Sequence, residues 1–359
     1  MKVGILTFHN VTNYGGVLQC FALQNALSNL DYDAEVIDYT NEYFKKYYSP
    51  FFIQEKNLRK FLYMVYAFRQ KCGRNKKFRE FRDKWLKMSE QTFDAKSIIQ
   101  VDTIYDAIIT GSDQVWNMEL TRGDENYMLP FCKKAKKVSY AASFGFSKVP
   151  NQLREVYAED LKGYSAMSVR EESAAQIVKD LIGIEPPVQI DPVFLLTENQ
   201  WEKTLDGEPR LCEQEYICVY KINQSEAYNL AKRLSAETNL PVVTIKADKT
   251  CPREFIKLKE ASPTDFVNAI YNAKYVITDS FHGTAFSIVF KKNFVSCADK
   301  RKNNRNTRID NVLKCFQLSH RTDASGLSAL ESQDDMKTVD QLIAQERKKA
   351  FEFLNRALS

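Results

Sequence analysis

The sequence predicts an α/β protein made of two doubly wound Rossmann-like domains facing a cleft, with a basic helical insert in the first domain. Apolar, strand-like runs alternate with helical patterns along most of the 359 residues. That length exceeds the usual size of a single core, since domains contain about 150 residues each. The stretch IEPPVQIDPVFLL has three prolines and no periodicity, as is typical of a connection between domains.

The expected first domain comprises residues 1–187. It opens with VGILTF, an unbroken apolar run typical of a buried parallel strand, followed by the loop HNVTNYGG and the helical run VLQCFALQNALSNL. DAEVIDY is the next expected strand and completes a strand–helix–strand unit. Further along, the expected strands are YDAIITGS, KKVSYAASFG and SAMSVRE, and the expected helices are VYAEDLKGY and EESAAQIVKDLIG.

Residues 43–87 interrupt this alternation. They contain two basic, aromatic helical stretches, centred on LRKFLYMVYAFRQ and KKFREFRDKWLK and joined near Cys72-Gly73. From Lys45 to Lys87, fourteen lysines and arginines face three acidic residues, a net charge of +11 in a chain whose total is +5. A localised anionic partner is therefore expected.

Aromatic residues are interleaved with the charges of this insert: Phe51, Phe52, Phe61, Tyr63, Tyr66, Phe68 and Trp85. Such a mixture suits contact with an anionic bilayer surface and with the diphosphate of a lipid-linked molecule. The alternative is a solvated helical hairpin whose aromatic side chains pack on the first domain.

The expected second domain comprises residues 188–335. Its strands are expected at YICVYK, PVVTIK, YVITDS and NFVSCAD, and helices at EAYNLAKRLSAETN, PTDFVNAIYNA and after His282. Residues 336–359 are expected to form one charged amphipathic helix. Many sugar-transferring enzymes share this two-domain architecture, and their ligands lie at the carboxyl ends of the strands.

Composition excludes several classes of protein. With 44% hydrophobic and 27% charged residues, the chain has the composition of a soluble globular protein. MKVGILTFHN is interpreted as a first strand rather than a signal peptide, and no run reaches the ~18 apolar residues of a spanning helix. The predicted location is the cytoplasm. The eight cysteines show no CxxC pair. We therefore expect buried, reduced thiols, and we expect no metal site.

Two loops after strands are candidates for ligand binding. The first contains Asn13, Tyr14, Gly15 and Gly16, where glycines allow a ligand to approach the backbone closely. A glycine turn needed only for packing is the alternative. The second loop contains Ser112, Asp113, Gln114 and Trp116, a mixture of polar groups and one aromatic ring that suits a sugar, against the alternative of a helix cap and a core tryptophan.

Arginines and one histidine complete the set of candidates. Arg170 follows a strand and precedes a helix, where a ligand carboxylate or phosphate explains a cation better than capping does. Arg305 and Arg308 lie in a basic run that is either a solvated loop or a phosphate-binding segment. His282 lies between a strand and a helix, where it is either a turn residue before Gly283 or a proton donor or acceptor.

The chain resembles the polysaccharide pyruvyl transferase family. The resemblance covers roughly residues 1 to 320 and lies in seven segments in register: MKVGILTFHNVTNYGGVLQCFALQ, ITGSDQVWN, SYAASFG, SVREESA, IDPVFLL, YVITDSFHGTAFSIVF and NTRIDNVL. It implies a GT-B-like fold, phosphoenolpyruvate as co-substrate without a cofactor, and a cyclic pyruvate ketal on a hexose of a surface polysaccharide precursor. The acceptor is expected to be linked to a lipid diphosphate, with a nucleotide-linked acceptor as the alternative, and nucleic acid is not an expected partner.

The resemblance also implies roles for particular residues. His282 matches the family's general acid, and Arg170 matches a donor-binding arginine. The first domain, with its two candidate loops, is expected to bind the acceptor, and the second domain the donor. The family commonly has a donor-binding arginine where this chain has Ser280, which leaves more of the donor's negative charge to Arg170, Arg305 and Arg308; the neighbouring Phe281 and Gly283 belong to the same donor-side motif. The alternatives are a nucleotide-sugar-dependent glycosyltransferase of the same architecture and a non-enzymatic protein that binds nucleic acid or membrane through the insert.

Overall fold

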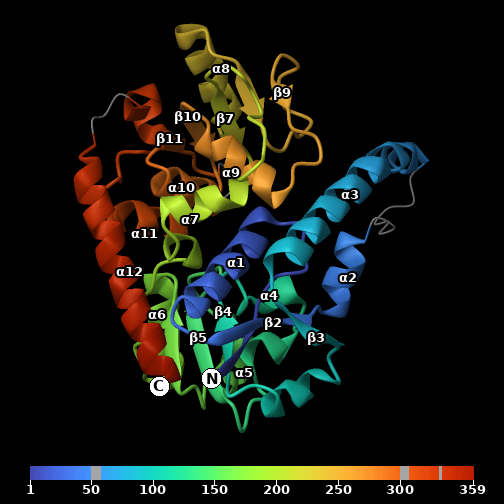
Figure 1. Cartoon of the computed structure of the whole chain (residues 1–359), viewed down its shortest axis with the longest axis vertical. Helices are drawn as coiled ribbons and strands as arrows, with labels where there is room; N and C mark the ends of the chain where they lie inside the picture. The colour runs from blue at the N-terminus through green and yellow to red at the C-terminus, as the bar shows by residue number, and fades with distance from the viewer. Residues whose placement is uncertain (50–57, 300–306, 331–333) are drawn as a thin grey trace. The chain divides into compact units, whose positions relative to one another are not determined.

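The computed structural model describes residues 1–49, 58–299, 307–330 and 334–359 (Figure 1). These residues form two compact units, one of Met1–Leu196 with Glu346–Ser359 and the other of Thr197–Gln345. The sequence placed the boundary after residue 187, but the chain up to Leu196 stays with the first unit. The reason is local: Val188 bridges to Val169 as an extension of the sheet, and the Tyr140 hydroxyl donates to the carbonyl of Ile190 at 3.0 Å.

The first unit is built on a six-stranded sheet in the order β3-β2-β1-β4-β5-β6, with every neighbouring pair parallel. Its strands are β1 Lys2–Leu6, β2 Asp33–Tyr39, β3 Met88–Phe93, β4 Ala107–Gly111, β5 Lys136–Ala142 and β6 Ala166–Val169. The central strands β1 and β4 are almost entirely buried, which is the reason that their sequences are unbroken apolar runs rather than alternating ones.

The helices of the first unit connect these strands and cover both faces of the sheet. The α-helices are α1 Tyr14–Ser28, α2 Glu42–Tyr48, α3 Leu58–Trp85, α4 Met118–Thr121, α5 Arg154–Asp160 and α6 Glu172–Ile182. The 3-10 helices are η1 Ile98–Thr103, η2 Glu125–Met128, η3 Asn151–Leu153 and η4 Pro192–Phe194.

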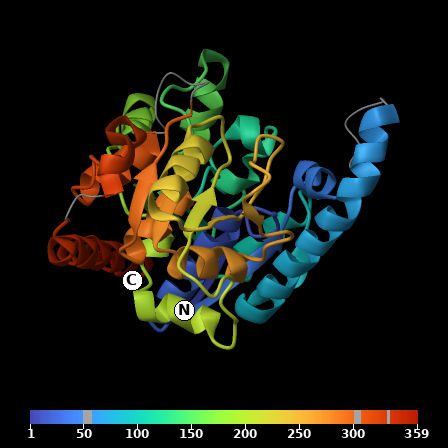
Figure 2. The same cartoon turned by 90° about the horizontal axis from the view of Figure 1, so that it is seen from above.

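The insert differs from the expected hairpin, because α3 is one continuous helix through Cys72-Gly73 (Figure 2). A single glycine costs a helix interior only about 1 kcal/mol, which is too little to end a long helix that packs on the protein. Helix α2 lies beside it: Lys71 Nζ donates to the carbonyl of Tyr47 at 3.3 Å and Asn75 Nδ2 to that of Tyr48 at 2.8 Å.

The last turns of α3 belong to the core of the first unit. Phe78 and Phe81 are buried, and the rings of Phe81 and Trp85 pack edge-on against Phe21 of α1 at 5.9 and 5.8 Å. Trp85 therefore packs on the first unit, as in the second of the two alternatives given for the insert, rather than contacting a membrane. Phe51 and Phe52, which carried part of the membrane hypothesis, lie outside the described residues.

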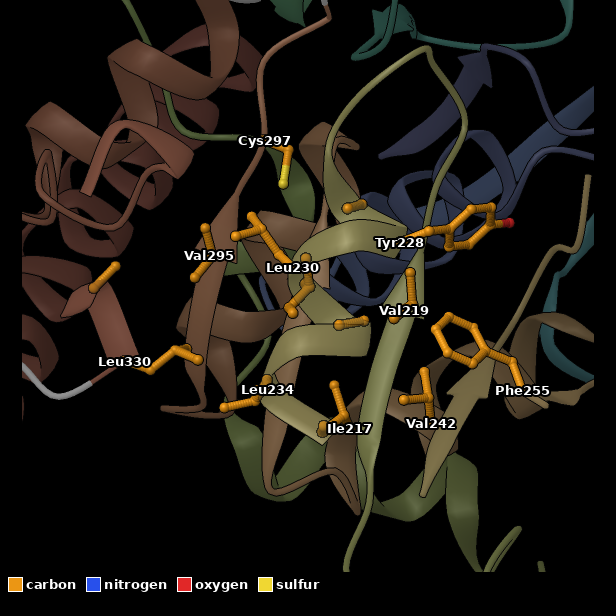
Figure 3. Packing of buried hydrophobic residues seen from close by; sticks show 14 residues of the cluster. Ile217, Val219, Tyr228, Leu230, Leu234, Val242, Phe255, Val295, Cys297 and Leu330 are labelled. Atoms are coloured by element: carbon orange, nitrogen blue, oxygen red, sulfur yellow. The ribbon is translucent and has the colours of Figure 1, made fainter. Parts of the chain in front are cut away.

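The second unit has a five-stranded parallel sheet in the order β11-β10-β7-β8-β9. Its strands are β7 Ile217–Tyr220, β8 Val242–Thr244, β9 Ile256–Lys257, β10 Tyr275–Thr278 and β11 Asn293–Ser296. Part of its core lies between α8 and the sheet, where Leu230 and Leu234 pack with Ile217, Val242 and Val295 (Figure 3). The prediction of two doubly wound α/β domains is confirmed.

The helices of the second unit complete this architecture. They are α7 Glu198–Glu202, η5 Lys203–Leu205, α8 Ala227–Thr238, α9 Pro263–Tyr271, α10 Phe281–Val289, α11 Thr307–Cys315 and η7 Asp323–Leu330. No helix in the described part of the chain is long and apolar enough to cross a membrane.

Helix α12, Met336–Leu358, has the extent expected from the sequence but is divided between the two units at Glu346. Within the first unit, Arg347 donates through Nε to the carbonyl of Phe194 at 2.8 Å and through a terminal nitrogen to that of Leu196 at 3.1 Å. The Phe353 ring lies 6.3 Å from that of Tyr140 in β5. The end of the chain is therefore an integral part of the first unit rather than an appended helix.

Candidate active site

Each sheet has a crossover point at which the winding direction reverses. In the first unit it lies between β1 and β4, because the chain moves outward from β1 to β3 on one side and from β4 to β6 on the other. In the second unit it lies between β7 and β10 for the same reason. Loops that leave the carboxyl ends of these strand pairs form the usual ligand site of an open α/β sheet.

The structure brings the two predicted acceptor-side loops together at the crossover of the first unit. The loop after β1 holds Asn13, whose side chain caps α1 by accepting from the amides of Gly15 at 3.0 Å and Gly16 at 3.4 Å. A Cβ atom on Gly16 would lie 3.1 Å from the carbonyl oxygen of Phe8 and 3.5 Å from Asp113 Oδ2. Glycine at this position therefore lets α1 approach both loops closely.

The second acceptor-side loop is largely buried. Ser112 and Trp116 have no exposed surface, and Asp113 is 7% exposed. The Trp116 ring packs against Phe144 at 5.2 Å and Tyr164 at 5.8 Å, so it is a core residue and not an accessible plate for a sugar ring. Tyr14 is also buried, with the Arg74 guanidinium 5.0 Å above its ring. Gln114, which is partly exposed, accepts from Asn117 Nδ2 at 3.0 Å.

Arg170 follows β6 and is enclosed by carboxylates. Its guanidinium lies 2.8 Å from Asp191, 3.7 Å from Asp113 and 3.9 Å from Glu171, and its side chain is 1% exposed. Burial disfavours the charged guanidinium, but these carboxylates outweigh that effect and raise the pKa of Arg170. One cation among three carboxylates does not favour a further anion. The contacts are those of a structural ion-pair network and give no support to the expected role in donor binding.

The crossover of the second unit is organised by Asp279, at the end of β10. Its carboxylate accepts from the amides of Ile222 at 2.7 Å and Asn223 at 3.0 Å and from Ser225 Oγ at 2.7 Å, all from the segment after β7. Burial raises the pKa of Asp279 despite these donors. The network fixes the loop after β7 against the start of α10.

His282 lies in the first turn of α10, directly after this network. Ser280 is the N-cap, and its side chain accepts from the amide of Gly283 at 3.4 Å. The His282 side chain is nearly buried, with 8% of the residue exposed, and its ring stands edge-on to that of Phe281. The Arg308 guanidinium lies over the Phe281 ring, 5.9 Å from its centroid. The structure thus brings His282, Phe281 and Arg308 together, whereas Arg305 lies outside the described residues.

Gly283 is required by packing. A Cβ atom there would lie 2.3 Å from Thr278 Oγ1, which is fixed because it donates to the carbonyl of Tyr220 at 2.7 Å and accepts from the amide of Ser280 at 3.1 Å.

We expect Gly283→Ala to destabilise the protein by a net amount near the upper end of the ~1–3 kcal/mol typical of overpacking, even though alanine favours a helix by about 1 kcal/mol. Urea unfolding measures the loss. Adding Thr278→Ala removes the closest contact, so the double variant should recover part of the stability. An unchanged unfolding midpoint in Gly283→Ala would show that the turn has room for a side chain.

Sequence reasoning missed several residues at these two crossover points. Asp191 and Glu171 hold Arg170, and Lys221 at the end of β7 is 7% exposed and pairs with Asp248 at 2.6 Å. A polar residue directly after an apolar strand was the available signal for Lys221 and Asp279. Among the described residues, no group of three or more histidine, cysteine, aspartate or glutamate side chains is placed to hold a metal ion.

Two doubly wound parallel sheets define this protein as a member of the GT-B fold class. Similar solved structures include UDP-GlcNAc 2-epimerase from Methanocaldococcus jannaschii, with a TM-score of 0.52, 9% identity and coverage of 96% of this chain and 99% of the other. Anabaena HepE, solved in complex with UDP and glucose, has a TM-score of 0.52, 10% identity and coverage of 99% and 100%. At such identities the likeness concerns the fold alone.

The model of the family described as "Polysaccharide pyruvyl transferase" matches residues 13–301. The chain therefore belongs to the polysaccharide pyruvyl transferase family and is an enzyme of that family. A search of curated proteins finds no match.

Proposed function

We propose that the protein transfers an enolpyruvyl-derived unit from phosphoenolpyruvate to a hexose of a surface polysaccharide precursor, forming a cyclic pyruvate ketal and releasing phosphate. Membership of the family supports pyruvyl transfer. The observation that carries the assignment of the site is the place of His282, in the first turn of α10 at the crossover of the second sheet.

The proposed chemistry gives His282 one task. The oxygen of a sugar hydroxyl bonds to C2 of phosphoenolpyruvate while His282 delivers a proton to C3, which becomes a methyl group. Loss of phosphate from C2 and attack by the second hydroxyl close the ketal. Of the two hydroxyl protons released, one restores the proton that His282 gave to C3, and the departing phosphate takes up the other. Imidazole exchanges protons near neutral pH, as this step needs. The reaction calls for no metal or redox cofactor.

The donor's carboxylate and phosphate need cations. We assign Arg308, which lies beside Phe281, to this role. Arg305 is proposed for the same role on the basis of the sequence alone. Ser280 and Gly283 contribute by shaping the turn that presents His282. Arg170 is left out of the donor site because of its three carboxylate partners.

The acceptor is proposed to be a hexose linked to a lipid diphosphate, bound beside the loops after β1 and β4. The protein then acts in the cytoplasm at the inner face of the plasma membrane, where its basic insert meets an anionic surface. Nucleic acid has no part in this proposal.

Phosphate release tests the function. The protein is incubated with phosphoenolpyruvate and a panel of lipid-diphosphate-linked and nucleotide-linked hexoses, and the product is identified by mass spectrometry. We expect phosphate release that depends on an acceptor, together with a pyruvate ketal on the sugar. Turnover of a sugar nucleotide without phosphoenolpyruvate would instead favour a GT-B glycosyltransferase.

A further inference from the structure

A cavity of about 430 Å³ lies within the first unit, between the insert and the crossover loop after β1. That volume falls in the range of ~300–1,000 Å³ found for small-molecule sites. Its described lining comes from the loop after β1, the end of β2, helix α2 and helix α3: Asn10, Val11, Thr12, Thr40, Phe44, Lys45, Tyr48, Ser49, Cys72, Asn75, Lys76, Arg79 and Arg82.

The charge of this lining has one sign. Lys45, Lys76, Arg79 and Arg82 are its charged members, and no aspartate or glutamate occurs among the described lining residues. The two lysines have acidic neighbours on their own helices, with Lys45 3.0 Å from Glu42 and Lys76 3.7 Å from Glu80. Those carboxylates are mostly exposed and therefore contribute little.

Arg82 is the charged lining residue that is partly buried. Burial lowers the pKa of Arg82, although Asp83 and Asp38 oppose the effect. Asp38 is already engaged by His9 Nε2 at 3.2 Å and by Thr92 Oγ1 at 2.7 Å. A partly buried guanidinium gains most from an anion that forms paired hydrogen bonds with it.

Two of the lining residues, Thr40 and Asn75, carry a buried polar atom without a hydrogen-bond partner among the described residues. Thr40 is 5% exposed, and its hydroxyl oxygen has no hydrogen-bond partner among the described residues. The amide oxygen of Asn75 is likewise buried without a partner there, while its Nδ2 is held by Tyr48. A hydroxyl can donate to a phosphate oxygen, and an amide oxygen can accept from a sugar hydroxyl.

The cavity is fixed in place by Arg74, which lies just outside its lining. Its guanidinium donates to the carbonyl of Thr12 at 3.0 Å and stacks 5.0 Å above the Tyr14 ring. This ties α3 to the loop after β1, so that cations of the insert and the loop at the crossover face the same space.

We propose that this cavity binds the phosphate or diphosphate group of a ligand. The identity of this group rests on the proposed function: it is the diphosphate that links the acceptor sugar to its carrier. The cavity shares Asn10 to Thr12 with the loop that continues into Asn13–Gly16, so a sugar attached to the bound diphosphate lies beside the first crossover. The cations of the insert thereby select an acceptor by its phosphates rather than by its sugar.

Binding of inorganic pyrophosphate and of UDP, measured by titration calorimetry without donor, tests the cavity separately from turnover. We expect both to bind the wild-type protein, and Lys76→Ala/Arg79→Ala to weaken them at least ~tenfold, because charge-assisted hydrogen bonds are lost. Both side chains are exposed, so the variant should fold. Lys84→Ala is the control for the loss of one exposed cation from the same helix, since Lys84 does not line the cavity.

Further arms separate the sources of phosphate. A short-chain, water-soluble lipid diphosphate should bind in the same way and compete with pyrophosphate. Vesicles with anionic phospholipid, compared with neutral ones, should bind the wild-type protein, and the cavity variant should lose no more of this binding than the removal of two exposed cations explains. The proposal fails if the wild type binds no diphosphate, or if the variant loses only vesicle binding. If pyruvyl transfer is found, the variant should raise the KM for the acceptor and not for phosphoenolpyruvate; an unchanged acceptor KM would overturn the link to the acceptor while leaving the transferase activity established.

Discussion

Replacing His282 by alanine is expected to lower the turnover of pyruvyl transfer by ~10²–10⁴, the span typical of a lost general acid. Donor affinity should change little, because the anions of phosphoenolpyruvate are held by arginines and not by the imidazole. Steady-state kinetics with phosphoenolpyruvate, together with direct measurement of donor binding, separate these two quantities.

The control is His282→Asn, which can still form a hydrogen bond but cannot deliver a proton. We expect it to be as inactive as the alanine variant while it keeps the melting temperature of the wild type. A structural histidine gives the opposite pattern, since asparagine would be tolerated and any loss of activity would follow a loss of stability. A stable and fully active His282→Asn protein would end the catalytic assignment.

Arg170→Ala is expected to have the largest effect on stability, a loss of ~3–5 kcal/mol in the free energy of unfolding, as for other broken buried ion pairs. The substitution leaves Asp191, which has no exposed side-chain surface, together with Asp113 and Glu171, without the guanidinium that they share. Urea unfolding followed by circular dichroism measures the loss.

The pH dependence of this loss has a definite sign. Protonation of a carboxylate removes the buried charge that lacks a partner, so the difference from wild type should be largest near neutral pH and should shrink as the pH falls. Arg170→Lys should recover only part of the stability, because an ammonium group cannot reach several carboxylates in one plane. A fully stable Arg170→Ala protein with a strongly raised KM for phosphoenolpyruvate would restore the donor-binding role inferred from the family resemblance.

The fold was predictable from the sequence because its signals are local. The strands in VGILTF and YVITDS each begin with an apolar run, and each is followed by polar loop residues and a helix. The continuity of α3 was not predictable in this way, because a glycine weakens a helix in every sequence but ends it only where packing permits.

The sites were harder to predict, because their chemistry depends on residues that are distant in sequence. Arg170 was correctly located after a strand, but its partners Asp113 and Asp191 come from two other segments and meet it only after folding. Trp116 shows the same limit: GSDQVWN fits both a sugar-binding loop and a core tryptophan, and the contacts of its ring with Phe144 and Tyr164 show that it is a core residue.

The return of α12 to the first unit has a consequence for dissecting the protein. A fragment that stops at Leu196 would lack the helical turns that pack on Tyr140 and hold the carbonyls of Phe194 and Leu196. Both chain ends nevertheless lie near the amino ends of the strands of the first sheet (Figure 1). The amide of Lys2 donates to Asp106 Oδ2 at 2.7 Å, and the amide of Lys136 donates to the carbonyl of Asp106 at 2.9 Å. Lys136 Nζ in turn donates to the carbonyl of Leu358 at 3.3 Å. Circular permutation, with a short linker from Ser359 to Met1, would therefore give the first unit as one unbroken polypeptide, with the join at the amino ends of the strands, opposite the crossover loops.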